Sequence, residues 1–377
     1  MQSNVPNSYR AATFSGPNSG ISIREVETKQ PRENEMLVKV HSVALSSTDQ
    51  LVRNDLVPGI NYPVIPSSAL TGTIVKLGPR STSGGSHAHF KEGQRVAAVT
   101  FKGALGEYAR VHCDSAVEIK SGSFKGEEEE AAIYAFDAGR IWGSYLRCER
   151  EHKAMDNEER RIMRELNQRI GFGKEEGVIV VYGEGGFARL AIDVLNKFQR
   201  TGGSSMISSL VGSGHSAGRT EYRVVLVATS DRFSAQDYNI NEKDMLVVDR
   251  HNIAHELKQR GGAAFVVCTE QVDQNRGAEA LLDGCRYGAS INVLSPTRDG
   301  KVQLPIANVI AKALRISGGP ILTHYLLDRT LELAQKNNLN VRTKKFRFDE
   351  QQLDQAWRSL ENPEVFEAPL VIVNQQQ

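Results

Sequence analysis

The sequence is short of cysteine, of net charge and of long apolar runs, and each shortage excludes a class of protein. Its 377 residues include four cysteines, and no two of them have C-x-x-C spacing. A disulfide framework and a structural zinc knot are therefore not expected, and the composition is typical of a reducing compartment. The 46 Lys and Arg residues nearly balance the 45 Asp and Glu residues. This balance gives no electrostatic footprint for nucleic acid or for an anionic membrane surface.

Nothing in the sequence has the length and apolarity of a membrane helix. The longest apolar runs, Val178 to Val181 and Ala263 to Cys268, fall far short of the roughly 20 residues that cross a bilayer. The first ten residues are polar and lack the apolar core of a secretory signal. We therefore expect a soluble, cytoplasmic protein.

The first third of the chain is rich in strand-like segments. They are short, β-branched and bounded by Gly, Pro or Asn, and they span residues 36–45, 69–78, 94–101 and 106–112. This pattern predicts an irregular barrel or sandwich. The stretch 80–93, rich in Gly and Ser, is expected to be a loop.

Further along, buried strands alternate with helices. The predicted strands span 178–183, 223–230, 244–249, 263–270, 289–296 and 313–319. The predicted helices span 188–198, 253–262, 278–288 and 326–337. This alternation predicts an α/β fold with a doubly wound parallel sheet.

A glycine-rich turn follows the first of these strands. Gly183, Gly185 and Ala188 form G-x-G-x-x-A between the strand VIVVY and an amphipathic helix. In this context the first Gly makes a tight turn, the second lets the backbone approach a pyrophosphate, and Ala allows close helix packing. The phosphates would sit on the N–H groups that open the helix, at Gly186 and Phe187. We expect a dinucleotide site, the alternative being a simple tight turn.

The choice of dinucleotide depends on the end of the second strand. An Asp or Glu there accepts hydrogen bonds from the ribose of NAD, whereas small polar residues and a cation accommodate a 2′-phosphate. Thr229, Ser230 and Arg232 follow this strand and favour NADPH over NADH, although Asp231 lies among them. The alternative is an ordinary polar turn.

Over nearly its whole length the chain resembles the medium-chain dehydrogenase/reductase superfamily. The matching segments are 45–55, 62–78, 90–97, 103–111, 127–139, 178–195 and 287–296. The resemblance implies a GroES-like β-barrel domain at 1–140, completed by 325–377, and a Rossmann domain at 141–324. The Rossmann domain would carry insertions at 149–170 and 201–220.

The sequence departs from the zinc-dependent members of this superfamily. Those members have a Cys at the start of the segment that matches 45–49, and a G-H-E triplet after the Pro that matches Pro66. Here the residues are Ser46-Ser47-Thr48 and Ser67-Ser68-Ala69, and hydroxyls are poor zinc ligands. Two histidine pairs lack a third ligand nearby: His87/His89 and His251/His255. We expect no zinc.

The chain looks like the zinc-free branch, which includes quinone reductases, enoyl reductases and stand-alone trans-acting enoyl reductases of polyketide pathways. The resemblance implies hydride transfer from the nicotinamide to an activated C=C of an α,β-unsaturated carbonyl compound. The protein would then orient the substrate and stabilise the enolate. The alternatives are a quinone or carbonyl reductase on the same scaffold, and a catalytically degenerate scaffold or binding protein.

Six residues match positions near the expected reaction centre: Ser46, Thr48, Asp49, Tyr62, Tyr134 and Arg140. Ser46 stands where the family commonly has an Asn that contacts substrate or nicotinamide, and Asp49 could instead brace its loop. Either phenol could face a carbonyl, the alternative being ordinary packing. Arg140 replaces the usual Thr and could meet a carboxylate, phosphate or enolate, or point into solvent.

The resemblance also assigns residues at the carboxyl ends of later strands to the cofactor. Those on the adenine and ribose side are Cys268, Thr269 and Glu270. Those near the nicotinamide are Leu294, Ser295, Gly318 and Gly319.

Both insertions precede strands of the predicted sheet. The charged segment 149–170 is expected to form a solvated helix with a thin apolar stripe, and the Gly/Ser segment 201–220 a mobile loop. Both should lie at the amino edge of the sheet, opposite the cofactor. This edge could bind a carrier protein or synthase, or carry only tolerated insertions. The substrate would be a small molecule, free or carrier-bound, and the protein a monomer or homodimer.

Overall fold

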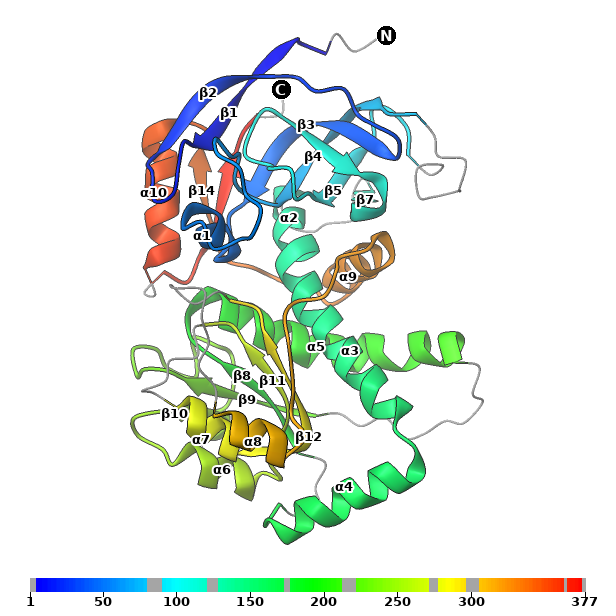
Figure 1. Ribbon diagram of the computed structural model, residues 1–377, viewed down its shortest axis with the longest axis vertical. Helices are drawn as coiled ribbons and strands as arrows, with labels where there is room; N and C mark the ends of the chain where they lie inside the picture. Colours follow the sequence, from blue (N-terminus) through cyan, green and yellow to red (C-terminus); the bar gives the residue numbers. More distant parts are fainter. Residues whose placement is uncertain are drawn as a thin grey trace. The chain divides into compact units, whose positions relative to one another are not determined.

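The computed structural model in Figure 1 describes residues 5–79, 90–120, 128–172, 177–211, 222–270, 277–295, 305–362 and 365–374. Contacts divide the chain into two compact units. Unit 1 comprises Met1–Gly139 and Ile321–Gln377, and unit 2 comprises Arg140–Pro320. No helix among the described residues is long and apolar enough to cross a membrane.

Unit 1 is built around a sheet that combines both ends of the chain. Its strands are β3 (Glu35–Ala44), β4 (Ala69–Leu77), β5 (Arg95–Val99), β6 (Tyr108–His112), β7 (Ala116–Glu118), β14 (Thr343–Arg347) and β15 (Ala368–Ile372). The order is β14-β15-β3-β4-β5-β7, with β6 also paired to β3. Strand β15 runs antiparallel to β3, with Val371 opposite Val43.

The remaining elements of unit 1 cover this sheet. They are β1 (Ser8–Phe14), β2 (Ile21–Glu27), α1 (Thr48–Arg53), α2 (Ala131–Ile133), a π-helical turn (Tyr134–Ala138), α9 (His324–Lys336) and α10 (Glu350–Glu361). Alternate residues of the strands point into a common core with Phe14 and Trp357, whose rings meet edge to face at 4.9 Å. The four strands predicted in the first third are thus confirmed as β3 to β6.

Unit 2 contains a six-stranded parallel sheet. Its strands are β8 (Val178–Tyr182), β9 (Arg223–Ala228), β10 (Met245–Val247), β11 (Ala263–Cys268), β12 (Cys285–Val293) and β13 (Arg315–Ser317). The order is β10-β9-β8-β11-β12-β13, so the direction of winding reverses at β8. This arrangement confirms the expected doubly wound α/β class.

Helices bury both faces of this sheet. They are α3 (Gly139–Ala154), α4 (Asn157–Arg169), α5 (Gly185–Val211), α6 (Ile253–Gln259), α7 (Ala278–Asp283) and α8 (Ile306–Ala311). On one face, Leu257 of α6 and Leu281 of α7 pack against Val266. On the other face, the rings of Tyr145 in α3 and Phe265 pack edge to face, with their centres 6.0 Å apart. Burial on both faces explains the continuous apolar strands.

The charged segment 149–170 forms the end of one helix and the whole of another, not a single helix as the sequence predicted. The chain breaks after Ala154, and α4 begins afresh with Asp156 as its N-cap. The Asp156 side chain accepts a hydrogen bond from Glu159 N at 2.8 Å, and the Glu159 side chain accepts one from Asp156 N at 3.0 Å. This capping box satisfies two N–H groups that an uninterrupted helix would bond internally.

Two other predicted boundaries are wrong. The Gly/Ser segment was expected to be a loop from residue 201, but α5 continues to Val211; residues 212–220 lie outside the described part of the chain. The helix predicted to reach 288 ends at Asp283, and β12 begins at Cys285.

Candidate dinucleotide-binding site

The turn between β8 and α5 can be made only with glycine at its first position. Gly183 has φ +131°, and a Cβ there would lie 2.6 Å from Thr269 Oγ1 and 2.8 Å from Glu270 Cβ. Its N–H donates to Val227 O at 3.0 Å. Gly185 also has a positive φ, +78°. The backbone is therefore held at the carboxyl ends of β8, β9 and β11, which in a parallel sheet is the edge that binds ligands.

The start of α5 presents backbone donors at this edge. Gly186 and Phe187 are half-buried, whereas Ala188 is buried against the sheet. The N–H of Gly185 is bonded to Tyr238 Oη at 3.1 Å. The first-turn N–H groups and the positive end of the helix dipole suit a phosphate group. The residues present thus fit a dinucleotide diphosphate.

The side chains after β9 are bonded to two carboxylates. Thr229 Oγ1 donates to Glu270 Oε2 at 2.9 Å, and Ser230 Oγ donates to Glu184 Oε2 at 2.5 Å. Arg232 Nη1 lies 3.8 Å from Glu184 Oε1. The structure therefore brings the three predicted residues together, and it adds Glu184, which occupies a variable position of the motif.

The two carboxylates differ in their surroundings. Burial is the main cause that raises the pKa of Glu270, and the nearby charge of Glu184 raises it further. Hydrogen bonds from Thr229 and from the backbone of Glu184, together with the charge of Arg232, act in the opposite direction. The side chain of Glu184 is 4% exposed and faces the end of β9. The raised pKa favours the neutral form of Glu270, the acid that shares this edge of the sheet with Glu184.

Arg140 lies among other residues that the sequence assigned to the cofactor. Its guanidinium donates to Leu294 O and lies 6.0 Å from the centre of the Phe187 ring. A Cβ on Gly319 would be 3.2 Å from Arg140 Nε. Arg140 is 7% exposed, so it does not point into solvent. A cation is thereby placed near the start of α5, where it could face an anionic ligand.

Three other predicted cofactor residues have different surroundings. Ser295 is buried, and Gly318 O is 3.5 Å from Arg147 Nη1. The thiol of Cys268 lies in the hydrophobic core, where burial raises its pKa to about 12. Only the backbone of Cys268 reaches the strand end, where its carbonyl accepts from Leu294 N at 3.0 Å.

In unit 1, Ser46, Thr48 and Asp49 form one hydrogen-bonded turn. Asp49 Oδ2 accepts from Ser46 N at 2.9 Å, and the hydroxyls of Ser46 and Thr48 are 2.6 Å apart. Asp49 is 2% exposed. Its geometry fits the bracing role rather than direct chemistry.

The two candidate phenols have partners within unit 1. Tyr62 Oη donates to Val52 O at 2.7 Å. Tyr134 Oη lies 2.9 Å from Leu339 O and 3.1 Å from Glu130 Oε2. Burial is the main cause that raises the pKa of both tyrosines. Tyr62 is thereby bonded to α1, the helix that begins at Thr48, whereas Tyr134 is bonded to the segment that follows α9.

The side chains at the positions of the family's zinc ligands do not fit zinc. Ser46 and Ser68 offer only hydroxyl groups and Ala69 only a methyl group, and the hydroxyl of Ser46 lies 2.6 Å from that of Thr48. Ser67, which precedes Ser68, donates its hydroxyl to Ala44 O at 2.9 Å. In the part of the chain that the structure describes, no group of three or more His, Cys, Asp or Glu residues could hold a metal ion. His255 Nε2 is instead 2.8 Å from Gln259 Nε2, and His251 Nδ1 lies near the backbone of Val247. His87 and His89 lie outside the described residues.

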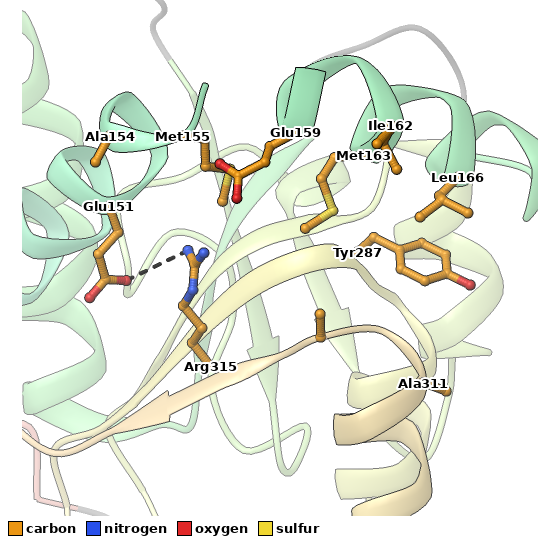
Figure 2. Close-up of a pocket in the computed structure, with 11 residues that line it drawn as sticks. Glu151, Ala154, Met155, Glu159, Ile162, Met163, Leu166, Tyr287, Ala311 and Arg315 are labelled. Atoms are coloured by element: carbon orange, nitrogen blue, oxygen red, sulfur yellow. Dashed lines mark ion pairs between the residues drawn. The ribbon is translucent and has the colours of Figure 1, made fainter. Parts of the chain in front are cut away.

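A cavity of about 690 Å³ lies elsewhere in unit 2, beside α4 (Figure 2). Ile162, Met163 and Leu166 of α4 point toward Tyr287 of β12, and at one end Glu151 lies 3.8 Å from Arg315. Asn167 Oδ1 accepts from Tyr287 N at 2.8 Å, which fixes α4 at the amino end of β12. The segment 149–170 therefore has the apolar stripe that the sequence predicts, and it lies at the predicted amino edge of the sheet. The cavity is away from the glycine turn.

Comparisons with known proteins agree with this architecture. Residues 32–150 match the alcohol dehydrogenase GroES-like domain. Alcohol dehydrogenase patD of Penicillium expansum is 21% identical, and the match covers 73% of both chains. Acryloyl-coenzyme A reductase of Metallosphaera sedula is 28% identical over 92 residues, which cover 24% of this chain and 26% of that protein.

Solved structures share the whole fold. Acetophenone reductase from Geotrichum candidum, in complex with NAD, has a TM-score of 0.66 and 14% identity, covering 98% of this chain and 99% of that one. Cinnamyl alcohol dehydrogenase from Sorghum bicolor gives the same score, identity and coverage. The expected GroES-like domain with a Rossmann α/β domain is thus confirmed. The domain match at residues 32–150 and the relatives agree with the resemblance of the sequence to the medium-chain dehydrogenase/reductase superfamily.

Proposed function

We propose that this chain is a zinc-independent, NAD(P)H-dependent oxidoreductase that transfers hydride to the activated C=C of an α,β-unsaturated carbonyl compound. The observation that carries the proposal is a contrast within the chain. The dinucleotide turn is complete, with Gly183 packed so closely that a side chain would collide with Thr269. The positions of the zinc ligands hold only hydroxyl and methyl groups, at Ser46, Ser68 and Ala69.

Without a Lewis acid, the substrate must be reactive enough to accept hydride directly. A conjugated C=C–C=O group meets this condition, because the carbonyl takes up the charge that develops. The bound reduced nicotinamide would supply the hydride. The chain's own residues would hold the diphosphate at the start of α5 and provide the buried cation of Arg140 beside it. The name of the Metallosphaera sedula relative supports a thioester of an unsaturated acid as the substrate class.

Carbonyl reduction is the second candidate, since the relatives and solved structures include an alcohol dehydrogenase and an acetophenone reductase. A degenerate member that binds dinucleotide without turnover is the third. NADPH is the cofactor predicted from Thr229, Ser230 and Arg232, with NADH as the alternative.

The test is to offer the purified protein an enone, a free and a carrier-bound unsaturated thioester, a quinone and a ketone. Each is offered with NADPH and with NADH, before and after treatment with a chelator. Oxidation of the cofactor with the enone or thioesters, unchanged after chelation, is expected. Turnover of the quinone or ketone alone would favour the second candidate, and loss of turnover that zinc restores would overturn zinc independence. Gly185→Val, which cannot easily adopt the positive φ of Gly185, serves as the control that should lose cofactor binding.

A further inference from the structure

A buried carboxylate lies where the adenosine end of a dinucleotide would bind. Glu184 follows Gly183 in the turn, and its side chain is 4% exposed. In a Rossmann domain the residue that reads the ribose normally comes from the end of the second strand. Here that strand, β9, ends with Ala228 and is followed by two hydroxyl residues, whose acidic partners are Glu184 from the turn itself and Glu270 after β11.

The contacts of this carboxylate show which residues it faces. Glu184 stands between two glycines with positive φ, at Gly183 and Gly185. Its two oxygens face the residues after β9: Oε2 accepts from Ser230 Oγ at 2.5 Å, and Oε1 lies 3.8 Å from Arg232 Nη1. The carboxylate thus engages two of the three groups that could otherwise receive a 2′-phosphate.

The third group is engaged as well. Thr229 Oγ1 donates to Glu270 Oε2 at 2.9 Å, and Glu270 is close enough to Glu184 for the two charges to interact. Two acids therefore converge on the ends of β8, β9 and β11. An ionised carboxylate accepts hydrogen bonds and donates none. It matches the two hydroxyl donors of a free ribose and repels a phosphate dianion.

We propose that Glu184 determines cofactor specificity, accepting the adenosine ribose hydroxyls of NADH and disfavouring the 2′-phosphate of NADPH. The inference rests on the proposed function, because it requires that the turn bind a dinucleotide. It differs from the NADPH preference that the sequence predicts from Thr229, Ser230 and Arg232. The difference arises because these side chains are bonded to Glu184 and Glu270 and are not aligned for a phosphate.

Binding, measured without turnover, tests this inference. We would titrate the protein by calorimetry with NADH and NADPH, and with ADP-ribose and 2′-phospho-ADP-ribose, which isolate the adenosine end. The wild type should bind each unphosphorylated ligand at least about tenfold more tightly than its phosphorylated counterpart. Glu184→Gln keeps the side-chain size and removes the charge. The ratio of affinities for the unphosphorylated and phosphorylated ligands should therefore decrease by about tenfold.

Asp231→Asn is the matched control. Asp231 is another acid after β9, but its side chain is 52% exposed and paired with Arg250. Its removal should change the preference by less than about threefold, because exposed charges are screened. An equal effect of both variants would overturn the assignment to Glu184.

The remaining outcomes are also decisive. Tighter binding of NADPH by the wild type, or an unchanged preference in Glu184→Gln, would overturn the inference and leave the proposed function standing. Binding of none of the four ligands by the wild type would overturn the proposed function itself. If Glu184→Gln fails to fold, the wild-type preference between ADP-ribose and 2′-phospho-ADP-ribose still decides whether the site rejects the phosphate.

Discussion

The hydroxyl of Tyr238 accepts a hydrogen bond from the backbone N–H of Gly185 at 3.1 Å. Tyr238 is fully buried and belongs to the segment between β9 and β10. Burial is the main cause that raises the pKa of its phenol, so the hydroxyl remains neutral. This contact links the glycine turn to a part of the chain 53 residues away, and it holds a backbone group that α5 cannot satisfy internally.

Tyr238→Phe should therefore loosen the turn. The buried N–H of Gly185 loses its acceptor, so the free energy of unfolding should fall by about 1–3 kcal/mol. Dinucleotide binding should weaken as well, because the turn is less well held. Tyr145→Phe is the control, since Tyr145 is also buried and its hydroxyl donates to Glu149 Oε1 at 2.9 Å, away from the turn. Urea unfolding and calorimetric titration measure the two effects, and unchanged binding in Tyr238→Phe would contradict the prediction.

Gly183→Ala should abolish dinucleotide binding. The new methyl group would lie 2.6 Å from Thr269 Oγ1 and would sit on a backbone with φ +131°. Strain of this kind costs about 1–3 kcal/mol, and the collision adds to it. Gly171→Ala separates the two causes, because Gly171 has φ +88° but nothing within 4 Å of its Cβ position. The control should lose some stability and keep its dinucleotide affinity; equal affinities in both variants would argue against a binding role for the turn.

The periodicity of the sequence was sufficient to predict the parallel sheet, because strands buried on both faces are continuously apolar. It did not predict the break before Asp156. Residues 149–169 contain no Gly or Pro that would mark the break, and the capping box that starts α4 forms only where the preceding helix has already ended. The extension of α5 to Val211 was missed for the opposite reason, because Gly and Ser are poor helix formers in isolation.

The candidate site was predictable only where one residue type is required. Gly183 and Gly185 follow from the backbone that the turn needs, and Ala188 from close packing. Glu184 was not predictable, because the motif leaves its position open and its partner Ser230 lies 46 residues away in the sequence. Tyr238 could not be found from local sequence, since its partner lies in another segment of the fold.

His41 should make the stability of the protein depend on pH. It lies in β3, with Nε2 3.2 Å from Thr73 Oγ1. Burial, with Arg95 and Lys39 nearby, lowers the pKa of His41 from 6.5 to about 4. Between these two values the unfolded chain binds the proton and the folded chain does not, so the free energy of unfolding should decrease as the pH falls from about 6.5 to about 4.

His41→Gln keeps a polar partner for Thr73 and removes this titration. Between pH 6.5 and pH 4 the free energy of unfolding should fall by about 1–2 kcal/mol less in the variant than in the wild type. This figure allows for solvent screening of a partly exposed group. Urea unfolding at several pH values measures the difference. At pH values above this range the imidazole is neutral in both states, so a comparison there isolates any packing cost of the substitution. Parallel pH profiles for the two proteins would contradict the prediction.

Tyr62→Phe and Tyr134→Phe should separate support of the fold from proton transfer. Tyr62 Oη donates to Val52 O at 2.7 Å, and Tyr134 Oη lies 2.9 Å from Leu339 O. A proton donor in the reaction contributes about 100-fold or more to the rate. A tyrosine hydroxyl that already donates to a backbone carbonyl must break that hydrogen bond before it can donate a proton to a substrate, and the raised pKa makes the proton harder to release. Each variant should therefore lose about 0.5–1.5 kcal/mol of stability and keep kcat within about threefold of the wild type. A fall in kcat of about 100-fold, with KM and Tm unchanged, would instead identify that tyrosine as the group that protonates the product.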